Sequence, residues 1–358
     1  MNEHIPSKMK VAIMNQPLDI EIKEVDVPTI SDSEALVKVM AVGVCGSDVH
    51  YYEHGRIGNF RVENPLILGH ECAGIVVQVG KNVKHVKPGD RVAIEPGVPC
   101  GHCEYCKTGA YNLCPDVRFL ATPPIDGAFA QYICHPADFL FPIPDSLSYE
   151  EAALNEPFSV GIHACQRIGL QPGTTVVIMG MGPVGLMAVV AAKAFGAKQI
   201  IVADLEPLRL QAAIHLGASH AVNIKEADPV QKIMELTGGK GAEYAFETAG
   251  NPTALQSALS SLKAGGKLAI VGLPQQDLIG FNVPFISDHE IDIYGIFRYA
   301  NTYPLGIDIL SSRIADVKSL LTDFYSLDQT QDALERARTN KSGSLKVIVY
   351  PNAITDTP

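Results

Sequence analysis

The sequence predicts an α/β protein of two domains, one rich in β-strands and the other built on a parallel sheet. Two observations favour this class. Short β-branched runs separated by turns fill the chain up to Glu156, whereas strand-like and helix-like stretches alternate from Gly173 onward. In addition, 358 residues are many for a single hydrophobic core.

The N-terminal region is expected to be β-rich, because its apolar runs are short, rich in β-branched residues and bounded by Pro, Gly and Asp. At Lys87–Asp90 proline restricts φ and glycine accepts positive φ, which predicts a turn. The predicted strands are Val11–Met14, Ile20–Val25, Ala35–Val44, Gly74–Val79 and Arg91–Ile94.

The region after Gly173 alternates between the two kinds of element. The predicted strands are Thr175–Met179, Gln199–Ala203, Ala221–Ile224, Tyr244–Phe246 and Lys267–Val271. The predicted helices are Pro183–Phe195, Pro207–Leu216, Pro229–Leu236 and Pro252–Leu262. This alternation implies right-handed crossovers and a parallel sheet. It stops after Ile296, so we expect a nucleotide domain over residues 157–295 and a β-rich domain formed by residues 1–156 and 296–358.

Three glycines, Gly180, Gly182 and Gly185, follow the strand Thr175–Met179 and open the next helix. In such a G-x-G-x-x-G turn the first glycine allows the tight turn, the second lets the backbone approach a pyrophosphate, and the third lets the helix pack on the strand. The helix N-terminus offers unpaired N–H groups to the phosphates. This context predicts a Rossmann dinucleotide-binding domain.

An acidic residue, Asp204, ends the second strand of this region, 24 residues after Gly180. A carboxylate there can bond both hydroxyls of the adenosine ribose and repels a 2′-phosphate, which favours NAD over NADP. Arg209 could accommodate that phosphate, so NADP stays a lesser alternative. With the carboxylate present, we expect Arg209 to pack near the adenosine. Asp204 could also cap the helix that follows.

Four cysteines, Cys100, Cys103, Cys106 and Cys114, follow a C-x2-C-x2-C-x7-C pattern. Cysteines on a tight turn can direct their sulfurs to one centre, and a fourth from the next loop completes a tetrahedron around zinc. The alternatives are two disulfides, which this spacing would strain, or a redox pair, which does not need the other two cysteines. We predict a structural zinc in a lobe over residues 97–115, with His102 outside the ligand set.

A second metal candidate comprises Cys45 and the pair His70–Glu71. Each signal is weak alone, but both precede the glycine turn in a chain that also has the cysteine lobe. Glu156, at the junction with the nucleotide domain, could supply a further oxygen to the same site.

Composition disfavours several other classes of protein. The net charge of −11 argues against binding to nucleic acid or to anionic membranes. Met1–Pro6 lacks the features of a signal peptide, and the apolar run Met187–Ala194 is too short to span a membrane. Eight cysteines without an export signal favour a cytoplasmic location.

The chain resembles the zinc-dependent medium-chain alcohol dehydrogenases along essentially its whole length, and most closely their sorbitol (L-iditol 2-) dehydrogenase branch. The resemblance is carried by the cysteine lobe and by Gly43-Val-Cys-Gly-Ser-Asp-Val-His50, Gly69-His-Glu71, Glu156-Pro-Phe-Ser-Val-Gly-Ile-His163 and Gly295-Ile-Phe-Arg-Tyr299. The last motif and Tyr51-Tyr-Glu-His-Gly-Arg-Ile57 are specific to the polyol branch. Simple-alcohol dehydrogenases typically have a cysteine ligand at the position of Glu156.

The resemblance implies a GroES-like catalytic domain, a Rossmann NAD domain and two zinc ions per subunit. Cys45, His70 and Glu71 would hold the catalytic zinc, while Glu156 either binds zinc directly or, as we prefer, holds a zinc-bound water. A mixed sulfur, nitrogen and oxygen set with one open position is what a catalytic zinc needs. Zinc would polarise the substrate hydroxyl, and a hydride would pass to the nicotinamide. The candidates for the proton relay are Ser47, the zinc-bound water, Glu156 and His50, although Ser47 could be only a turn residue.

The resemblance also implies a polyol substrate, oxidised reversibly at a secondary hydroxyl, as in sorbitol to fructose, xylitol to xylulose, or L-iditol to its ketose. A site that bonds hydroxyls strongly disfavours analogues that lack them. The residues expected to contact this substrate are Tyr51, Phe119, Glu156, Arg298 and Tyr299, although Arg298 could instead be an exposed salt-bridge partner. Further cofactor contacts are expected from Val184, Val271, Gly272, Leu273, Phe297 and Arg298.

Other readings of the chain stay open at this point. The nearest alternative is a related dehydrogenase for threonine or 2,3-butanediol. A non-catalytic NAD-binding protein of this fold would be expected to lack the metal ligands, and a zinc-ribbon nucleic-acid binder conflicts with the charge. Relatives are commonly tetramers, so we expect a homo-oligomer. The residues expected to be structural are His163, Cys72, Cys134 and Cys165.

Overall fold

The structure, a computed structural model, describes residues 5–274, 276, 278–339 and 342–353. Residues 1–4, which belong to the segment searched for a signal peptide, lie outside the described residues. The chain forms two compact units. Unit 1 comprises the residues up to Glu156, Tyr303–Ser311 and the residues from Leu320 onward, and unit 2 comprises Pro157–Thr302 and Ser312–Ser319.

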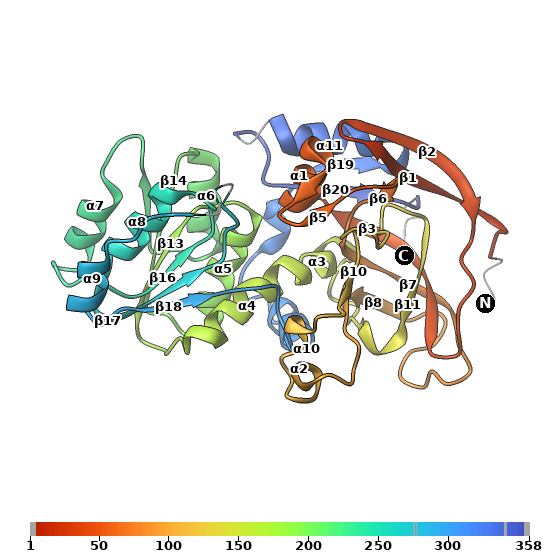
Figure 1. The fold of residues 1–358 in the computed structure, drawn as a ribbon, viewed down its shortest axis with the longest axis horizontal. Helices are drawn as coiled ribbons and strands as arrows, with labels where there is room; N and C mark the ends of the chain where they lie inside the picture. Colours follow the sequence, from red (N-terminus) through yellow and green to blue (C-terminus); the bar gives the residue numbers. More distant parts are fainter. Residues whose placement is uncertain (1–4, 275, 277, 340–341, 354–358) are drawn as a thin grey trace. The chain divides into compact units, whose positions relative to one another are not determined.

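Unit 2 is built on a six-stranded, entirely parallel sheet in the order β15-β14-β13-β16-β17-β18 (Figure 1). Its strands are β13 (Thr175–Met179), β14 (Gln199–Asp204), β15 (His220–Asn223), β16 (Ala242–Glu247), β17 (Leu262–Ile270) and β18 (Asp292–Gly295). Its helices are α5 (Pro183–Ala194), α6 (Pro207–Leu216), α7 (Pro229–Leu236), α8 (Pro252–Ser260) and α9 (Val283–Asp288), and α4 (Asn155–Ile168) begins in unit 1 and continues into unit 2. The strand order reverses between β13 and β16, the switch point at which such sheets bind ligands.

Local signals explain where these elements begin and end. The helices α5 to α9 each have proline in the first turn, where its missing N–H leaves no bond unmade. Asp228 and Asn251 accept bonds from first-turn amides of α7 and α8. The apolar strand β13 has buried residues on both faces. All strands and helices predicted for this region are present, whereas the short and mostly exposed β18 had not been predicted.

Unit 1 contains a seven-stranded sheet in the order β12-β8-β7-β3-β20-β19, with β11 also paired to β3, and a three-stranded sheet β2-β1-β6. The long strands are β1 (Lys8–Gln16), β2 (Asp19–Asp26), β3 (Glu34–Gly43), β7 (Glu71–Val79), β8 (Arg91–Ile94), β11 (Tyr132–Pro136), β19 (Leu321–Ser326) and β20 (Lys346–Tyr350). The short strands are β4 (Arg56–Ile57), β5 (Phe60–Arg61), β6 (Leu66–Ile67), β9 (Gly97–Val98), β10 (Arg118–Phe119) and β12 (Leu140–Pro142). The five strands predicted for this region are all present.

The helices of unit 1 are few and mostly short. They are α1 (Gly46–His54), α2 (Glu104–Lys107), α3 (Tyr149–Ala153), α10 (Tyr303–Ser311) and α11 (Thr330–Thr339). The 3-10 turns are η1 (Tyr111–Leu113), η2 (Ala137–Phe139), η3 (Val317–Leu320) and η4 (Leu327–Gln329). Within the described ranges, no helix is both long enough and apolar enough to cross a bilayer.

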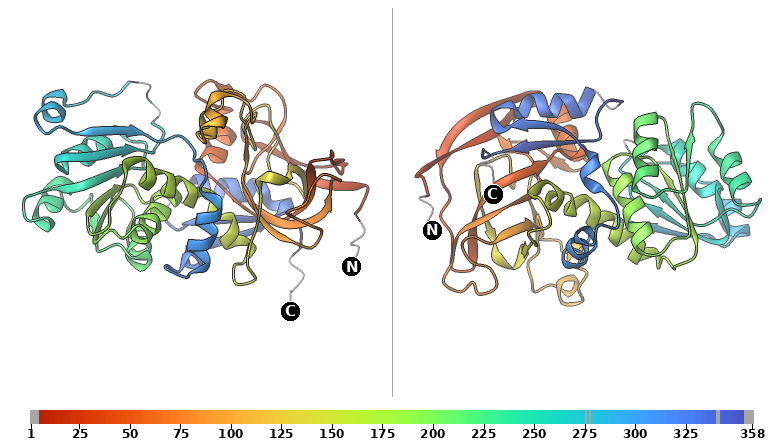
Figure 2. Two further views of the ribbon diagram at one scale, coloured as in Figure 1. Left: turned by 90° about the horizontal axis from the view of Figure 1, so that it is seen from below. Right: turned by 180° about the vertical axis from the view of Figure 1, so that it is seen from behind.

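The C-terminal segment completes the large sheet of unit 1. The strand β20 lies antiparallel to β3, with Ile348 opposite Gly43, and parallel to β19. Figure 2 shows this segment, in blue, beside the N-terminal strands in red. The chain returns to unit 1 at Tyr303, whose hydroxyl donates to Ile94 O at 2.8 Å. Residues 312–319 belong to unit 2, where Asp316 pairs with His215.

Candidate metal and dinucleotide sites

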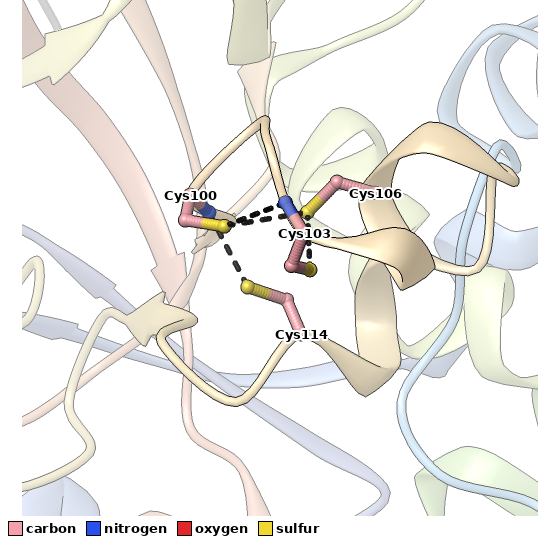
Figure 3. Close-up of side chains that lie close together, drawn as sticks. All are labelled: Cys100, Cys103, Cys106 and Cys114. Atoms are coloured by element: carbon pink, nitrogen blue, oxygen red, sulfur yellow. Dashed lines mark hydrogen bonds between the residues drawn. The ribbon is translucent and has the colours of Figure 1, made fainter.

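The four lobe cysteines gather at one point of unit 1, as Figure 3 shows. Their ligand sulfurs all lie within 4.8 Å of one another, and the Cys103 and Cys106 sulfurs are 3.3 Å apart. Backbone amides of Cys100 and Cys103 donate to the sulfurs of Cys114 and Cys100. All eight cysteines of the chain are free, so the disulfide alternative is wrong. His102 bonds the carbonyl of Cys100 instead of joining the cluster.

The thiols of this cluster differ in acidity. Backbone amide donors, that of His102 foremost, lower the pKa of Cys100 to about 6. Burial and a hydrogen bond with Cys103 raise the pKa of Cys106 to about 12. A bound cation would favour the thiolate form of all four. The cluster therefore fits a closed tetrahedral zinc site.

A second cluster consists of Cys45, His70 and Glu71, whose ligand atoms also lie within 4.8 Å of one another. Cys45 is the N-cap of α1, and Glu71 begins β7 directly after His70. His70 and Glu71 are buried and Cys45 is partly exposed. Both predicted metal clusters are thus brought together by the fold, and the second combines the donor types of a catalytic zinc site.

Asp48 organises this second cluster, and sequence reasoning did not single it out. Its carboxylate accepts bonds from the amides of Cys45 and Gly69, both at 2.9 Å, and lies 3.5 Å from His70 Nδ1. Burial lowers the pKa of His70, but the neighbouring Asp48 and Cys45 raise it, and the net result is well above the ordinary value. A carboxylate behind a ligating histidine orients its ring. The sequence offers one hint of this role, because Asp48 stands three residues after Cys45, the N-cap of α1.

Lys346, at the start of β20, is a second residue that the sequence did not reveal. Its ammonium group contacts Glu71 Oε2 and donates to Val44 O at 3.0 Å. Only 2% of the Lys346 side chain and 1% of the Glu71 side chain are exposed. Because 275 residues separate the two, no local pattern could have found the pair.

The remaining predicted residues of unit 1 lie in different settings. The centroid of the Phe119 ring is 5.6 Å from that of the His70 ring. Tyr51 and Glu156 are buried, whereas Ser47 is partly exposed on α1. Their contact with a substrate stays a prediction.

Glu95, directly after β8, is a buried carboxyl group that had not been considered. Burial raises its pKa to about 7, and the charge of Glu156 contributes in the same direction. The Tyr111 hydroxyl donates to Glu95 Oε1 at 2.7 Å and opposes that shift. Tyr111 belongs to the cysteine lobe, so this bond connects the lobe to the large sheet.

In unit 2, the glycine turn has the geometry that a dinucleotide requires. Gly180 has φ +99°, and a Cβ on it would lie 2.8 Å from Ala249. A Cβ on Gly185 would overlap Gly180 O, which confirms the tight helix packing. A Cβ on Gly182 would meet no described atom within 4 Å. The backbone at Gly182, the N-cap of α5, is therefore open to a ligand such as a pyrophosphate.

Asp204 ends β14 at the same edge of the sheet. It accepts bonds from the amides of Met181 at 2.5 Å and Glu206 at 2.9 Å, so it also holds the glycine turn. Glu206, not Asp204, is the N-cap of α6, so the capping alternative is wrong. Arg209 Nε is buried and, among the described residues, has no hydrogen-bond partner.

The other predicted cofactor residues of unit 2 follow β17 and β18. The amides of Val271 and Gly272 donate to Glu247 O, and Leu273 is exposed. The Arg298 guanidinium lies 4.9 Å from the exposed Phe297 ring. Tyr299 is buried in the same unit. Both segments follow the carboxyl ends of their strands. Val184, in the first turn of α5, likewise follows the carboxyl end of β13.

The residues expected to be structural are mostly buried. Cys72 and Cys165 are buried and Cys134 is partly buried, and burial raises the pKa of each thiol. Burial lowers the pKa of His163 to about 4, so its imidazole is neutral at pH 7.

Comparison with known families identifies the class of protein. The model described as "Alcohol dehydrogenase GroES-like domain" matches residues 31–145, and the model described as "Zinc-binding dehydrogenase" matches residues 183–312. The chain belongs to the zinc-dependent medium-chain alcohol dehydrogenase superfamily. This confirms the predicted fold class, in which a Rossmann-like parallel sheet accompanies a β-rich GroES-like domain.

Individual proteins and solved structures show more specifically what this chain is similar to. A sorbitol dehydrogenase of Bacillus subtilis (strain 168) is 65% identical, with 98% of this chain and 100% of the relative covered. A crystal structure of an Escherichia coli dehydrogenase of unknown specificity involved in membrane biogenesis matches with TM-score 0.91 and 42% identity over 96% of this chain and 99% of that one. A zinc-binding dehydrogenase of Sinorhizobium meliloti 1021, crystallised with NADP, matches with TM-score 0.89 and 29% identity over 97% and 100%.

Proposed function

We propose that this oxidoreductase reversibly oxidises a secondary hydroxyl of a polyol to a ketose, as in sorbitol to fructose, with NAD as hydride acceptor. The single observation that carries the proposal is the cluster of Cys45, His70 and Glu71, with ligand atoms within 4.8 Å of one another. The 65% identity to a sorbitol dehydrogenase supports the substrate class and disfavours the threonine and butanediol alternatives.

The donor set at this cluster fits zinc. A thiolate, an imidazole and a carboxylate are ligands that catalytic zinc sites use, and three protein ligands leave a position for the substrate. Zinc there would act as a Lewis acid on the substrate hydroxyl, and bound NAD would accept the hydride. The four lobe cysteines fit a second, structural zinc.

The side chains around the cluster would handle the proton and shape the site. Ser47, His50, Glu156 and a zinc-bound water are proposed to relay the proton of the substrate hydroxyl to solvent. Burial lowers the pKa of His50, so its imidazole is neutral at pH 7 and able to accept a proton. Phe119, beside the His70 ring, would keep water from that side of the site. Tyr51, Arg298 and Tyr299 are each proposed to bond polyol hydroxyls.

The preference for NAD is proposed from the adenosine end of the glycine turn. Asp204 receives two backbone amide bonds, and its carboxylate is proposed to repel the 2′-phosphate of NADP. Arg209 is the residue that could offset this repulsion. Because a relative was crystallised with NADP, the rates with NAD and with NADP should both be measured. A cytoplasmic homotetramer is also proposed.

The test is the initial rate of NADH formation with sorbitol, xylitol, L-iditol, threonine and 2,3-butanediol, repeated with NADP. We expect polyols to react fastest, and NAD to be preferred. Removal of zinc by a chelator should abolish turnover, and added zinc should restore it. Full activity in a sample shown to be free of metal would contradict the proposed mechanism.

A further inference from the structure

We propose that Lys346 is a positioning residue for the metal site of unit 1. It holds one carboxylate oxygen of Glu71 and so prevents that side chain from binding the metal with both oxygens. This inference rests on the proposed function, because it requires zinc at Cys45, His70 and Glu71.

The contacts of the ammonium group are unusual for a lysine. Lys346 Nζ contacts Glu71 Oε2 and donates to Val44 O at 3.0 Å, and both charged side chains are almost completely buried. A buried ammonium group is tolerated only where it is paired and hydrogen-bonded. Val44 immediately precedes Cys45, so Lys346 touches the chain beside one ligand and the side chain of another.

The sheet fixes this arrangement. Gly43 of β3 lies opposite Glu71 of β7 on one side and opposite Ile348 of β20 on the other. A Cβ on Gly43 would overlap Glu71 Oε2 and lie 2.8 Å from Lys346 Cε. Because Gly43 has no side chain, Lys346 and Glu71 have room to meet beside it. Glu71 belongs to β7 and Lys346 to β20, the strands on either side of β3.

The charges around the metal site indicate how Lys346 and Glu71 would act on the metal. The thiolate of Cys45 and the carboxylate of Glu71 would together neutralise the two positive charges of zinc. Lys346 adds one positive charge and contacts Oε2, which makes the other Glu71 oxygen the better donor for the metal. A metal that receives less charge from its ligands is a stronger Lewis acid. We infer that Lys346 keeps the site electrophilic at the expense of metal affinity.

A purely structural role for Lys346 makes the opposite prediction. If the lysine only offsets the burial of Glu71, its removal should disorder the site and weaken metal binding. If it restrains Glu71, its removal should let both oxygens bind zinc and so strengthen metal binding. The sign of the change in zinc affinity separates these two roles.

The experiment compares Lys346→Met, which keeps the length of the side chain without its charge, with Lys346→Arg, which keeps the charge. Zinc affinity is measured by competition with a chelator, and the Cys45→Ser variant identifies the part due to the lobe zinc. Cobalt(II) substitution reports the number of ligands through its visible absorption. For Lys346→Met we expect roughly tenfold tighter zinc binding, weaker cobalt d–d absorption from a higher coordination number, and a lower kcat. Lys346→Arg should stay close to the parent protein.

Two outcomes would overturn the inference: zinc binding by Lys346→Met that is equal to or weaker than in the parent, or an unchanged cobalt spectrum. Should that variant fail to fold, Glu71→Gln and the double variant Glu71→Gln/Lys346→Met decide, since the double variant leaves no buried charge unpaired. Their cobalt spectra should be the same, because Lys346 acts through Glu71, and a difference would contradict this.

The result also separates this inference from the proposed function. If the parent protein binds no metal that depends on Cys45, the proposed function fails and the inference with it. If the parent binds zinc and oxidises polyols while the Lys346 variants leave affinity and spectrum unchanged, only the inference fails.

Discussion

Glu95 shows how one buried group can make the stability of this protein depend on pH. Its side chain is 1% exposed, and burial raises the pKa from 4.5 to about 7. Well below pH 4.5 the carboxyl group is neutral in both the folded and the unfolded chain. As the pH rises toward 7 the unfolded chain ionises first, so folding stability falls, and it stays lower above that range.

Replacing Glu95 by glutamine should remove this loss of folding stability at higher pH. A shift from 4.5 to about 7 corresponds to about 3 kcal/mol above pH 7. We therefore expect Glu95→Gln to raise the thermal midpoint by several degrees at pH 8 and by much less near pH 5. Thermal unfolding of the zinc-loaded protein at both pH values measures this.

The Tyr111→Phe variant is the matched control for Glu95→Gln. The hydroxyl of Tyr111 lowers the pKa of Glu95. Its loss should therefore move the pH range over which folding stability changes to higher pH. Equal midpoint shifts for Glu95→Gln at pH 5 and pH 8 would show that ionisation of Glu95 is not the cause.

The sequence predicted residues whose chemistry is visible in their type and spacing. Cys45, His70 and Glu71 were identified as candidates for that reason, and the fold brings them together. Asp48 and Lys346 were missed because aspartate and lysine are common, and their roles exist only through contacts made in the folded chain.

At the scale of elements, the turn between β13 and α5 was the part best predicted from sequence. Gly180 has a positive φ and Gly185 lies too close to Gly180 O to carry a side chain, and such steric demands of the backbone are local. The strand β18 was missed because its four residues have no clear apolar pattern. Its place in the sheet comes from pairing with β17, which is a tertiary contact.

Two alanine substitutions in this turn should have contrasting effects. Gly182 has φ −66° and open space around a Cβ, so Gly182→Ala should fold normally but weaken NADH binding by at least about tenfold. Gly185→Ala places its Cβ on Gly180 O and should destabilise unit 2 by about 3 kcal/mol.

Fluorescence of bound NADH and thermal unfolding separate the two effects, and the chain has no tryptophan to interfere with the first measurement. Gly182→Ala with unchanged NADH affinity would exclude this glycine from the pyrophosphate site.

At the scale of the whole molecule, the two metal clusters should have separable roles. The four cysteines fill a tetrahedral shell, whereas Cys45, His70 and Glu71 are three ligands that leave a position open. The division into two kinds of unit followed from the sequence, because periodicity changes along the chain. The boundary at Tyr303 did not, since it is defined by tertiary contacts, among them the bond from Tyr303 to Ile94 O.

Loss of one lobe cysteine should therefore affect stability more than chemistry. We expect Cys103→Ser to lose one zinc per subunit and several kcal/mol of stability, while kcat per folded molecule stays within about twofold of the parent. Metal analysis, thermal unfolding and active-site titration check this. Cys45→Ser, the control, should lose the other zinc and its turnover with little change in the thermal midpoint. Lost turnover in fully folded Cys103→Ser would contradict the separation.

The position of β20 has a consequence for how the protein is made. This strand lies between β3 and β19 in the sheet of unit 1, yet it is formed by Lys346–Tyr350. During translation the residues of unit 2 leave the ribosome earlier, so unit 2 is able to fold first. Until residue 350 emerges, one edge of β3 has no partner strand over Val42–Gly43 and Glu71 lacks its lysine. The nascent chain therefore acquires its nucleotide-binding unit before its metal site is complete.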